Sequence, residues 1–342
     1  MKKYLLFTIA LLSIVACKDE NKADDPIGDN GRTKRTEFLL DNMSSLSQKG
    51  YMVGQEDATL YGIGWAGDSC RSDIHTCCGD MPAIIGFDIT GIEGNLPYNT
   101  DSIYFDAIRN EAINQYDRSG VVTISWRSAS VLTSEKAEAC CDSICAFLKT
   151  LETPYGVRVP VILRPLGQNK AFWQTLSERI EDNEVVNALL MYSPATSCGG
   201  DKTKFLAEYP GDDFVDMIGI SLYCNVSNAE SVDSISIFAK ALDKELAMLS
   251  AIGKEHSKPY ALCETGFPGI KTNDWFTAVL QPVIDKYNIC YMMFGRNDNT
   301  TPGRFCVPFP GHSAMRDFGH FYNASRTLFL HDVNALYLDL KH

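Results

Sequence analysis

Apolar residues in this chain gather in eight short runs that recur along most of its length. Several runs, such as "AIIGF", "VVTIS" and "DMIGISLY", are apolar at successive positions rather than at alternate ones. A strand with this pattern is buried on both faces, as strands of a parallel sheet are. The pattern predicts eight strands: Met52–Asp57, Ala83–Ile89, Val121–Arg127, Val159–Leu166, Ala188–Pro194, Val215–Cys224, Tyr260–Gly266 and Cys290–Arg296.

Segments with helically spaced apolar residues lie between these runs. Ser102–Tyr116 is one, and "SISIFAKALDKELAMLSAIGKEH", Ser234–His256, is the clearest. Strands that alternate with helices eight times predict an α/β fold, a single (β/α)₈ TIM barrel. An open doubly wound sheet is the alternative. The number of strands and the lack of a clean nucleotide-binding loop favour the barrel.

One glycine-rich stretch imitates a nucleotide site. "GIGWAG", Gly62–Gly67, matches G-x-G-x-x-G, but "DSCRSD" follows it and is typical of a loop. A dinucleotide site needs a helix that starts within the motif. The sequence also has no phosphate loop and no HExxH. We therefore expect no cofactor and no catalytic metal.

The first residues are typical of an export signal. Met1–Lys3 is basic, and Tyr4–Val15 is apolar but too short for a mature membrane span. The stretch ends in "SIVAC", which resembles a bacterial lipoprotein signal. We predict a signal peptide over 1–16 and lipid on Cys17. An ordinary signal peptide with an incidental cysteine is the alternative.

The next stretch predicts how the protein is attached. Residues 17–36 are mostly polar and read as a flexible tether, so the barrel is expected over 37–342. The acidic start, Lys18–Glu20, resembles tags of surface-exposed lipoproteins. We expect an outer-membrane lipoprotein that is held by its lipid anchor and faces the periplasm or the cell surface.

The composition limits the kinds of partner that we expect for this protein. The 342 residues suit one large domain, and we expect a monomer. A net charge of −12 repels phosphate backbones, so nucleic acid is excluded as an expected partner. Twelve cysteines are present, and removal of Cys17 leaves an odd number. We interpret them as small buried side chains with one or two disulfides; no histidine joins them in a zinc-like pattern.

Polar and aromatic residues recur where the predicted strands end. In a (β/α)₈ barrel these ends form the functional face. Arginines, carboxylates and aromatic rings that gather there are typical of a carbohydrate site. The residues are Gln55, Glu56, Asp57, Asp88, Trp126, Arg127, Arg164, Tyr192, Ser193, Tyr223, Glu264, Arg296 and Asn297. Glu264, in "KPYALCETGFPG", suits the nucleophile of a retaining glycosidase.

Several of these stretches carry a family resemblance. "GQEDATLYGIGW", "GDMPAIIGFDITGIE", "VTISW", "VDMIGISLY", "ALCETG" and "RFCVPFPGHSAMRDF" follow one another in the family's order. From about Gly50 to Leu336 the chain resembles glycoside hydrolase family 26, to which many bacterial β-mannanases belong. The resemblance implies that Glu264 is the nucleophile, that Tyr223 lies beside it and that Trp65 lines the cleft. We expect substrate contacts from Trp65, Trp126, Arg127, Arg164, Tyr223 and Arg296.

The chain departs from the family at four positions. The fourth-strand Arg-Pro is usually followed by His-Glu, whose glutamate is the acid/base. Here "RPLGQN" runs almost directly into "KAFWQ", and Gln168 stands nearest that position. Arg127 and Gln55 replace histidines, and Gly295 replaces a stacking tryptophan.

These departures leave three hypotheses. The first is a retaining endo-β-1,4-mannanase-like hydrolase that acts on β-mannan or a related polysaccharide, with activity impaired by the missing acid. The second is a surface polysaccharide-binding protein on the same barrel. The third is an enzyme of shifted specificity with a substitute acid, for which Glu56, Asp57 and Glu178 are the candidates.

Overall fold

The computed structural model describes residues 25–68, 70–94, 96–127, 134–224, 232–298 and 300–340. The predicted signal peptide and Cys17 lie outside the described residues. So do residues 17–24 of the predicted tether.

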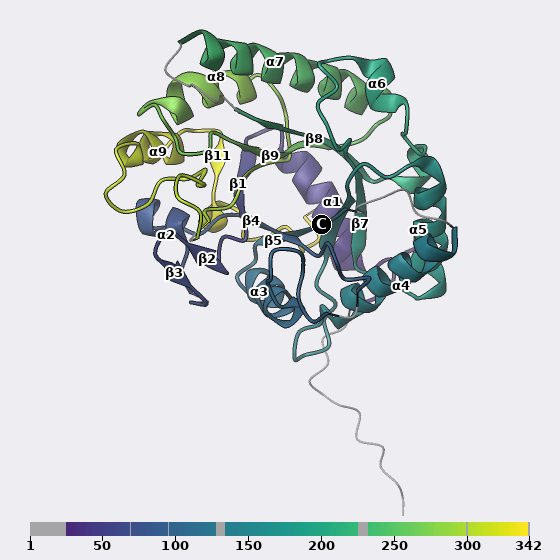
Figure 1. Cartoon of the computed structure of the whole chain (residues 1–342). Helices are drawn as coiled ribbons and strands as arrows, with labels where there is room; N and C mark the ends of the chain where they lie inside the picture. Colours follow the sequence, from purple (N-terminus) through teal and green to yellow (C-terminus); the bar gives the residue numbers. More distant parts are fainter. Residues whose placement is uncertain are drawn as a thin grey trace, which may run out of the picture.

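Eight parallel strands within the described residues close into a barrel (Figure 1). Each strand pairs with the next along the chain, and β10 pairs back with β1. All eight predicted strands and the (β/α)₈ fold are therefore confirmed. The strands are β1 (Tyr51–Glu56), β4 (Ile84–Asp88), β5 (Val121–Trp126), β6 (Val161–Pro165), β7 (Ala188–Tyr192), β8 (Met217–Tyr223), β9 (Tyr260–Gly266) and β10 (Tyr291–Phe294).

Helices surround the strands in the outer ring seen in Figure 1. The predicted helices over 102–116 and 234–256 are confirmed as α3 (Phe105–Asp117) and α7 (Val232–Glu255). The other α-helices that follow in the chain are α2 (Asp73–Cys78), α4 (Ser134–Thr150), α5 (Lys170–Asp182), α6 (Lys202–Leu206), α8 (Gln281–Ile284) and α9 (Met315–Tyr322). Two short 3₁₀ helices are η1 (Asp212–Phe214) and η3 (Leu330–Asp332), and η2 (Trp275–Leu280) is a π-helix. The short strands β2 (Tyr61–Gly62) and β3 (Trp65–Ala66) form a hairpin, and β11 (Thr327–Leu328) adds to β1.

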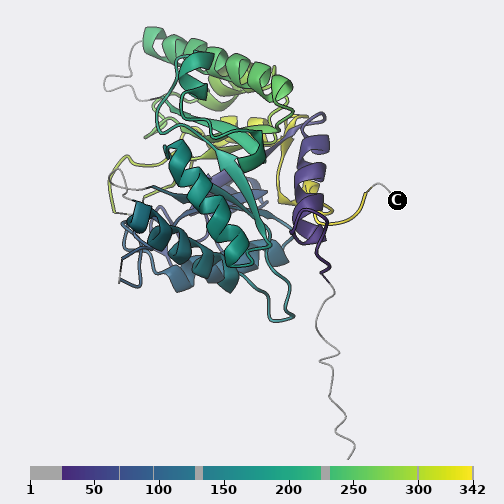
Figure 2. The ribbon, with the colours of Figure 1, turned by 90° about the vertical axis from the view of Figure 1, so that its right-hand side faces the viewer.

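Helix α1 (Lys34–Leu46) closes the amino end of the barrel. Its Leu39 and Met43 share one buried cluster with Met52, Ile84 and other residues of the barrel interior. Figure 2 shows this helix standing at one end of the strands. The opposite, carboxyl end is therefore the one left for a functional site.

The folded part begins earlier than the sequence indicates. Thr33 caps α1, and Arg32 forms an ion pair with Asp216 at 2.6 Å. The boundary expected between residues 36 and 37 therefore falls inside α1. The reason is that the polar residues before the helix find partners on the barrel, which composition alone does not reveal.

The cysteines differ from expectation. In the part of the chain that the structure describes, all eleven are free thiols, and most of them are buried. The one or two expected disulfides are therefore not found there. The same residues contain no cluster of His, Cys, Asp or Glu arranged to hold a metal ion. No described helix is long and apolar enough to cross a membrane.

Candidate active site at the carboxyl end of the barrel

Glu264 lies at the centre of the barrel mouth. An irregularity in the β8–β9 pairing places it opposite Ser221. Its carboxylate accepts one hydrogen bond from Arg164 and another, of 3.1 Å, from the hydroxyl of Tyr223. The Glu264 side chain is still 17% exposed. A carboxylate that is fixed by two donors and open to solvent is placed to attack a ligand.

Arg164 anchors this carboxylate from the far side of the mouth. Its side chain is 1% exposed, and its second amino group donates to Ser221 Oγ at 3.2 Å. Burial alone would lower the pKa of Arg164, but the Glu264 carboxylate raises it above its ordinary value. The guanidinium therefore stays charged, and its hydrogen bond fixes the position of the Glu264 side chain.

Glu56 and Asp88 are further carboxyl groups at the mouth. Burial raises the pKa of Glu56 well above its ordinary value, and the charges of Glu264, Asp57 and Asp88 raise it further, against the opposing charge of Arg296. Burial also raises the pKa of Asp88. The site thus combines an anchored carboxylate with carboxyl groups that favour the protonated form.

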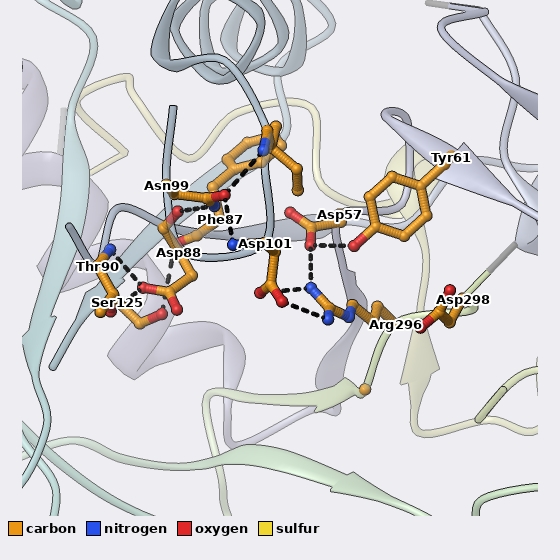
Figure 3. Close-up of polar contacts among 12 residues, drawn as sticks. Asp57, Tyr61, Phe87, Asp88, Thr90, Asn99, Asp101, Ser125, Arg296 and Asp298 are labelled. Atoms are coloured by element: carbon orange, nitrogen blue, oxygen red, sulfur yellow. Dashed lines mark hydrogen bonds and ion pairs between the residues drawn. The ribbon is translucent and has the colours of Figure 1, made fainter. Parts of the chain in front are cut away.

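Arg296 is held by a network beside the mouth (Figure 3). It pairs with Asp101 at 2.6 Å and lies 3.7 Å from Asp57, whose carboxylate accepts from Tyr61 at 2.8 Å. Burial raises the pKa of Asp57 to about 7, although Tyr61 and Arg296 oppose the shift. Arg296 therefore orders the loops that carry these carboxylates.

Sequence reasoning missed Asp101. It lies in the loop after β4, and no strand pattern marks it. Asn99 shapes that loop, since its side-chain oxygen accepts the backbone N–H groups of Asp101 and Ile103 at 3.0 and 2.9 Å. Figure 3 shows Asp101 brought against Arg296. The Asn-x-Asp spacing, typical of a turn, was the only available signal.

Trp65 forms a fixed part of the wall. Its ring N–H donates to Asp73 at 2.8 Å, and the guanidinium of Arg71 lies 5.2 Å from the ring centre. Asp73 also accepts from Asn297 at 2.7 Å, so it ties this hairpin to the end of β10. Because the ring is only 7% exposed, the loop position expected for Trp65 leaves little surface for stacking.

The expectation that Trp126 contacts substrate is wrong for this structure. Its side chain is 0% exposed, stacks on Phe172 of α5 and donates to Glu93 at 2.9 Å. Neighbouring strand residues point to opposite faces. Trp126 therefore points away from the barrel axis and packs beneath α5.

The remaining predicted residues lie at the strand ends. Arg127 follows β5, is exposed, and donates its backbone N–H to Thr90 at 3.0 Å. Tyr223 contacts Glu264, as expected. A Cβ atom at Gly295 would meet the Tyr223 hydroxyl at 2.6 Å. The Tyr223 hydroxyl therefore lies next to the position that a side chain at residue 295 would occupy.

Gln168 occupies a short connection. Only Leu166–Asn169 join β6 to α5, whose first turn Asn169 caps by accepting from Phe172 N–H at 2.9 Å. The Gln168 amide donates to the carbonyl of Leu166 at 2.9 Å. The connection carries no carboxyl group.

Comparison with known proteins supports one family. The sequence profile described as glycosyl hydrolase family 26 matches residues 135–292. A family 26 β-mannanase structure from Bacteroides ovatus is 32% identical, with a TM-score of 0.84 over 91% of this chain and 99% of that one.

Two other mannan-degrading proteins are similar to this chain. A mannan endo-1,4-β-mannosidase from Bifidobacterium adolescentis is 25% identical over 91% of this chain, which spans 36% of that relative. The catalytic domain of an endo-β-1,4-mannanase from Bacillus sp. JAMB-750 has the same fold, with 24% identity and a TM-score of 0.78 over 94% of this chain and 97% of that one. Because the Bacteroides ovatus β-mannanase is 32% identical over almost its whole length, the chain belongs to glycoside hydrolase family 26.

Proposed function

We propose that the protein is a retaining glycoside hydrolase that cleaves β-1,4-mannan or a related polysaccharide within the chain. The observation that carries the proposal is the Glu264 carboxylate, which Arg164 and Tyr223 hold at the barrel mouth. The relatives named as mannanases and a mannosidase supply the substrate class.

The geometry suits nucleophilic attack. Arg164 approaches one oxygen of Glu264 and Tyr223 the other, so the carboxylate cannot rotate freely. Burial and the Glu264 charge raise the pKa of Tyr223 well above its ordinary value, so the hydroxyl remains a donor. Attack on the anomeric carbon would form a glycosyl ester on Glu264.

A second candidate function is polysaccharide binding without cleavage. The observation that favours it is the β6–α5 connection, because Leu166–Asn169 carry no acid to protonate a leaving group. General acid catalysis is worth typically 10²–10⁴-fold. A barrel without this acid would bind a glycan but cleave it only very slowly.

Release of reducing ends from β-1,4-mannan, with the oligosaccharide products resolved, separates the two functions. A hydrolase releases mannan oligosaccharides, and Glu264→Gln abolishes that release. The matched control is Glu255→Gln, whose carboxylate lies on the outer helix α7 and pairs with Lys202. Binding of mannan without any products would support the binding protein instead.

We also propose that the protein is a lipoprotein of the outer membrane, anchored through Cys17. Its support is the basic start, the apolar run and "SIVAC". An anchored hydrolase would act on polysaccharide at the membrane surface.

A further inference from the structure

We propose that Glu56, at the carboxyl end of β1, is the acid/base that works with Glu264. The inference rests on the proposed hydrolase function and deepens it. The group that transfers the proton would then lie on the first barrel strand, whereas the family's usual acid/base follows the fourth.

The strand register points Glu56 into the barrel mouth. Met52 belongs to the buried cluster of the barrel interior. Since alternate residues of a strand point to the same face, Gly54 and Glu56 also point inward. Glu56 pairs with Gly86 of β4, where an added Cβ would meet Met293 and Thr123 of the interior. The Glu56 side chain is half-buried, so a ligand in the mouth can reach it.

Only β10 separates Glu56 from Glu264. Gln55 of β1 pairs with Phe294 of β10, and Phe294 pairs with Thr265 of β9. Gly295 follows β10 and has no side chain to stand between the two carboxyl groups; the hydroxyl of Tyr223, which donates to Glu264, borders that place. A retaining glycosidase needs its two carboxyl groups about 5–5.5 Å apart.

The two groups differ in what surrounds them. Glu264 accepts hydrogen bonds from Arg164 and Tyr223. Within the described residues, no hydrogen bond or ion pair reaches the Glu56 carboxyl. Burial, followed by the charge of Glu264, raises the pKa of Glu56; Asp57 and Asp88 act in the same direction, and Arg296 opposes them. Unequal environments of this kind separate an acid from a nucleophile.

The other carboxyl groups of the mouth are already engaged. Asp57 accepts from Tyr61 and lies near Arg296, which makes it part of the loop network. Asp88 accepts from both the backbone and the hydroxyl of Thr90, at 2.8 and 2.6 Å. Glu178 lies on α5, in the outer ring. Among the carboxyl groups that the structure describes at the mouth, Glu56 is the inward one that remains free to transfer a proton to a ligand.

The proposed hydrolysis has two steps, and Glu56 transfers a proton in each. Protonated Glu56 gives its proton to the glycosidic oxygen as the bond from that oxygen to the anomeric carbon breaks and Glu264 forms an ester with the carbon. The Glu56 carboxylate then takes a proton from water, whose oxygen attacks the same carbon and releases Glu264. Both groups return to their starting states.

The test compares Glu56→Gln with wild type on β-1,4-mannan and on an aryl β-mannoside with a good leaving group. The amide should slow mannan cleavage by about 10²–10⁴-fold. The aryl substrate leaves unaided, so it should still load Glu264, and the glycosyl-enzyme should accumulate. Azide needs no base, so it should speed release of the adduct from Glu56→Gln but not from wild type.

The Glu255→Gln variant should match wild type in every assay. If Glu56→Gln does not fold, Glu56→Ala repeats the test, with azide again as the readout. Mannan cleavage at the wild-type rate by either variant would overturn the role of Glu56 while leaving the hydrolase intact. A wild-type protein that cleaves neither substrate and forms no adduct would overturn both.

Discussion

Arg164 and Glu264 stand one hundred residues apart in sequence, on β6 and β9, and pair across the barrel mouth. The arginine is almost completely buried, whereas the carboxylate remains partly open to solvent. This pair fixes the Glu264 side chain in a largely buried place.

The Arg164→Ala variant should be strongly destabilised. Removal of one partner from a buried ion pair costs about 3–5 kcal/mol, because the other charge is left uncompensated. Urea unfolding measures the loss. The matched control is Arg304→Ala, since Arg304 is exposed and lies 3.6 Å from its partner Asp298; its midpoint should hardly move. Equal stability of the two variants would contradict the anchoring role of Arg164.

The Gly295→Ala variant should destabilise the protein by about 1–3 kcal/mol, as overpacking does. The new Cβ would meet Tyr223 at 2.6 Å and push its hydroxyl from Glu264. Activity on an aryl mannoside should fall with stability. The control is Gly319→Ala in α9, where a Cβ meets nothing within 4 Å. Unaltered unfolding and activity in Gly295→Ala would show that Tyr223 is not held in place there.

Asp57 should make stability depend on pH. Burial raises its pKa in the folded protein from the ordinary value of 3.8 to about 7. A group whose folded pKa is raised stabilises most at low pH, and that contribution is lost as the pH rises between these values. From pH 4 to 7, wild type should therefore lose stability relative to Asp57→Asn.

Unfolding free energies at several pH values measure this difference. The control is Asp106→Asn, whose carboxylate is 79% exposed and should leave the wild-type slope unchanged. An Asp57→Asn variant that parallels wild type from pH 4 to 7 would contradict the prediction.

The sequence was sufficient for the strands and for Glu264. Runs such as "VVTIS" are apolar at successive positions because both faces of a barrel strand are buried, and that pattern is local. Glu264 was found because it interrupts such a run just before Thr265-Gly266. Both signals can be read without knowing which segments meet in space.

The other site residues depended on contacts that a linear pattern does not contain. Tryptophan is a common residue type in carbohydrate sites, but side chains alternate in direction along β5, and Trp126 therefore points outward and packs against Phe172. Asp101 reaches Arg296 only because Asn99 folds the loop after β4. The different surroundings of Glu56 and Glu264 likewise arise only when β1 and β9 both flank β10.

The Cys17→Ala variant should lose membrane attachment. Lipid can no longer be added at that position, so the protein should move to the soluble fraction or keep its uncleaved signal. Cell fractionation and the mass of the mature protein measure this. The control is Cys70→Ala, which lies on the barrel and should leave fractionation unchanged. Membrane attachment of Cys17→Ala equal to wild type would contradict the anchor.

The proposed function requires that Glu264 attacks the sugar. The most direct measurement is intact mass after incubation with an activated aryl β-mannoside, followed by peptide mapping of the labelled residue. We expect a gain of one mannosyl group on the peptide that contains Glu264, most abundant in Glu56→Gln and absent from Glu264→Gln. An adduct on another residue, or cleavage of the mannoside by Glu264→Gln at the wild-type rate, would contradict attack by Glu264.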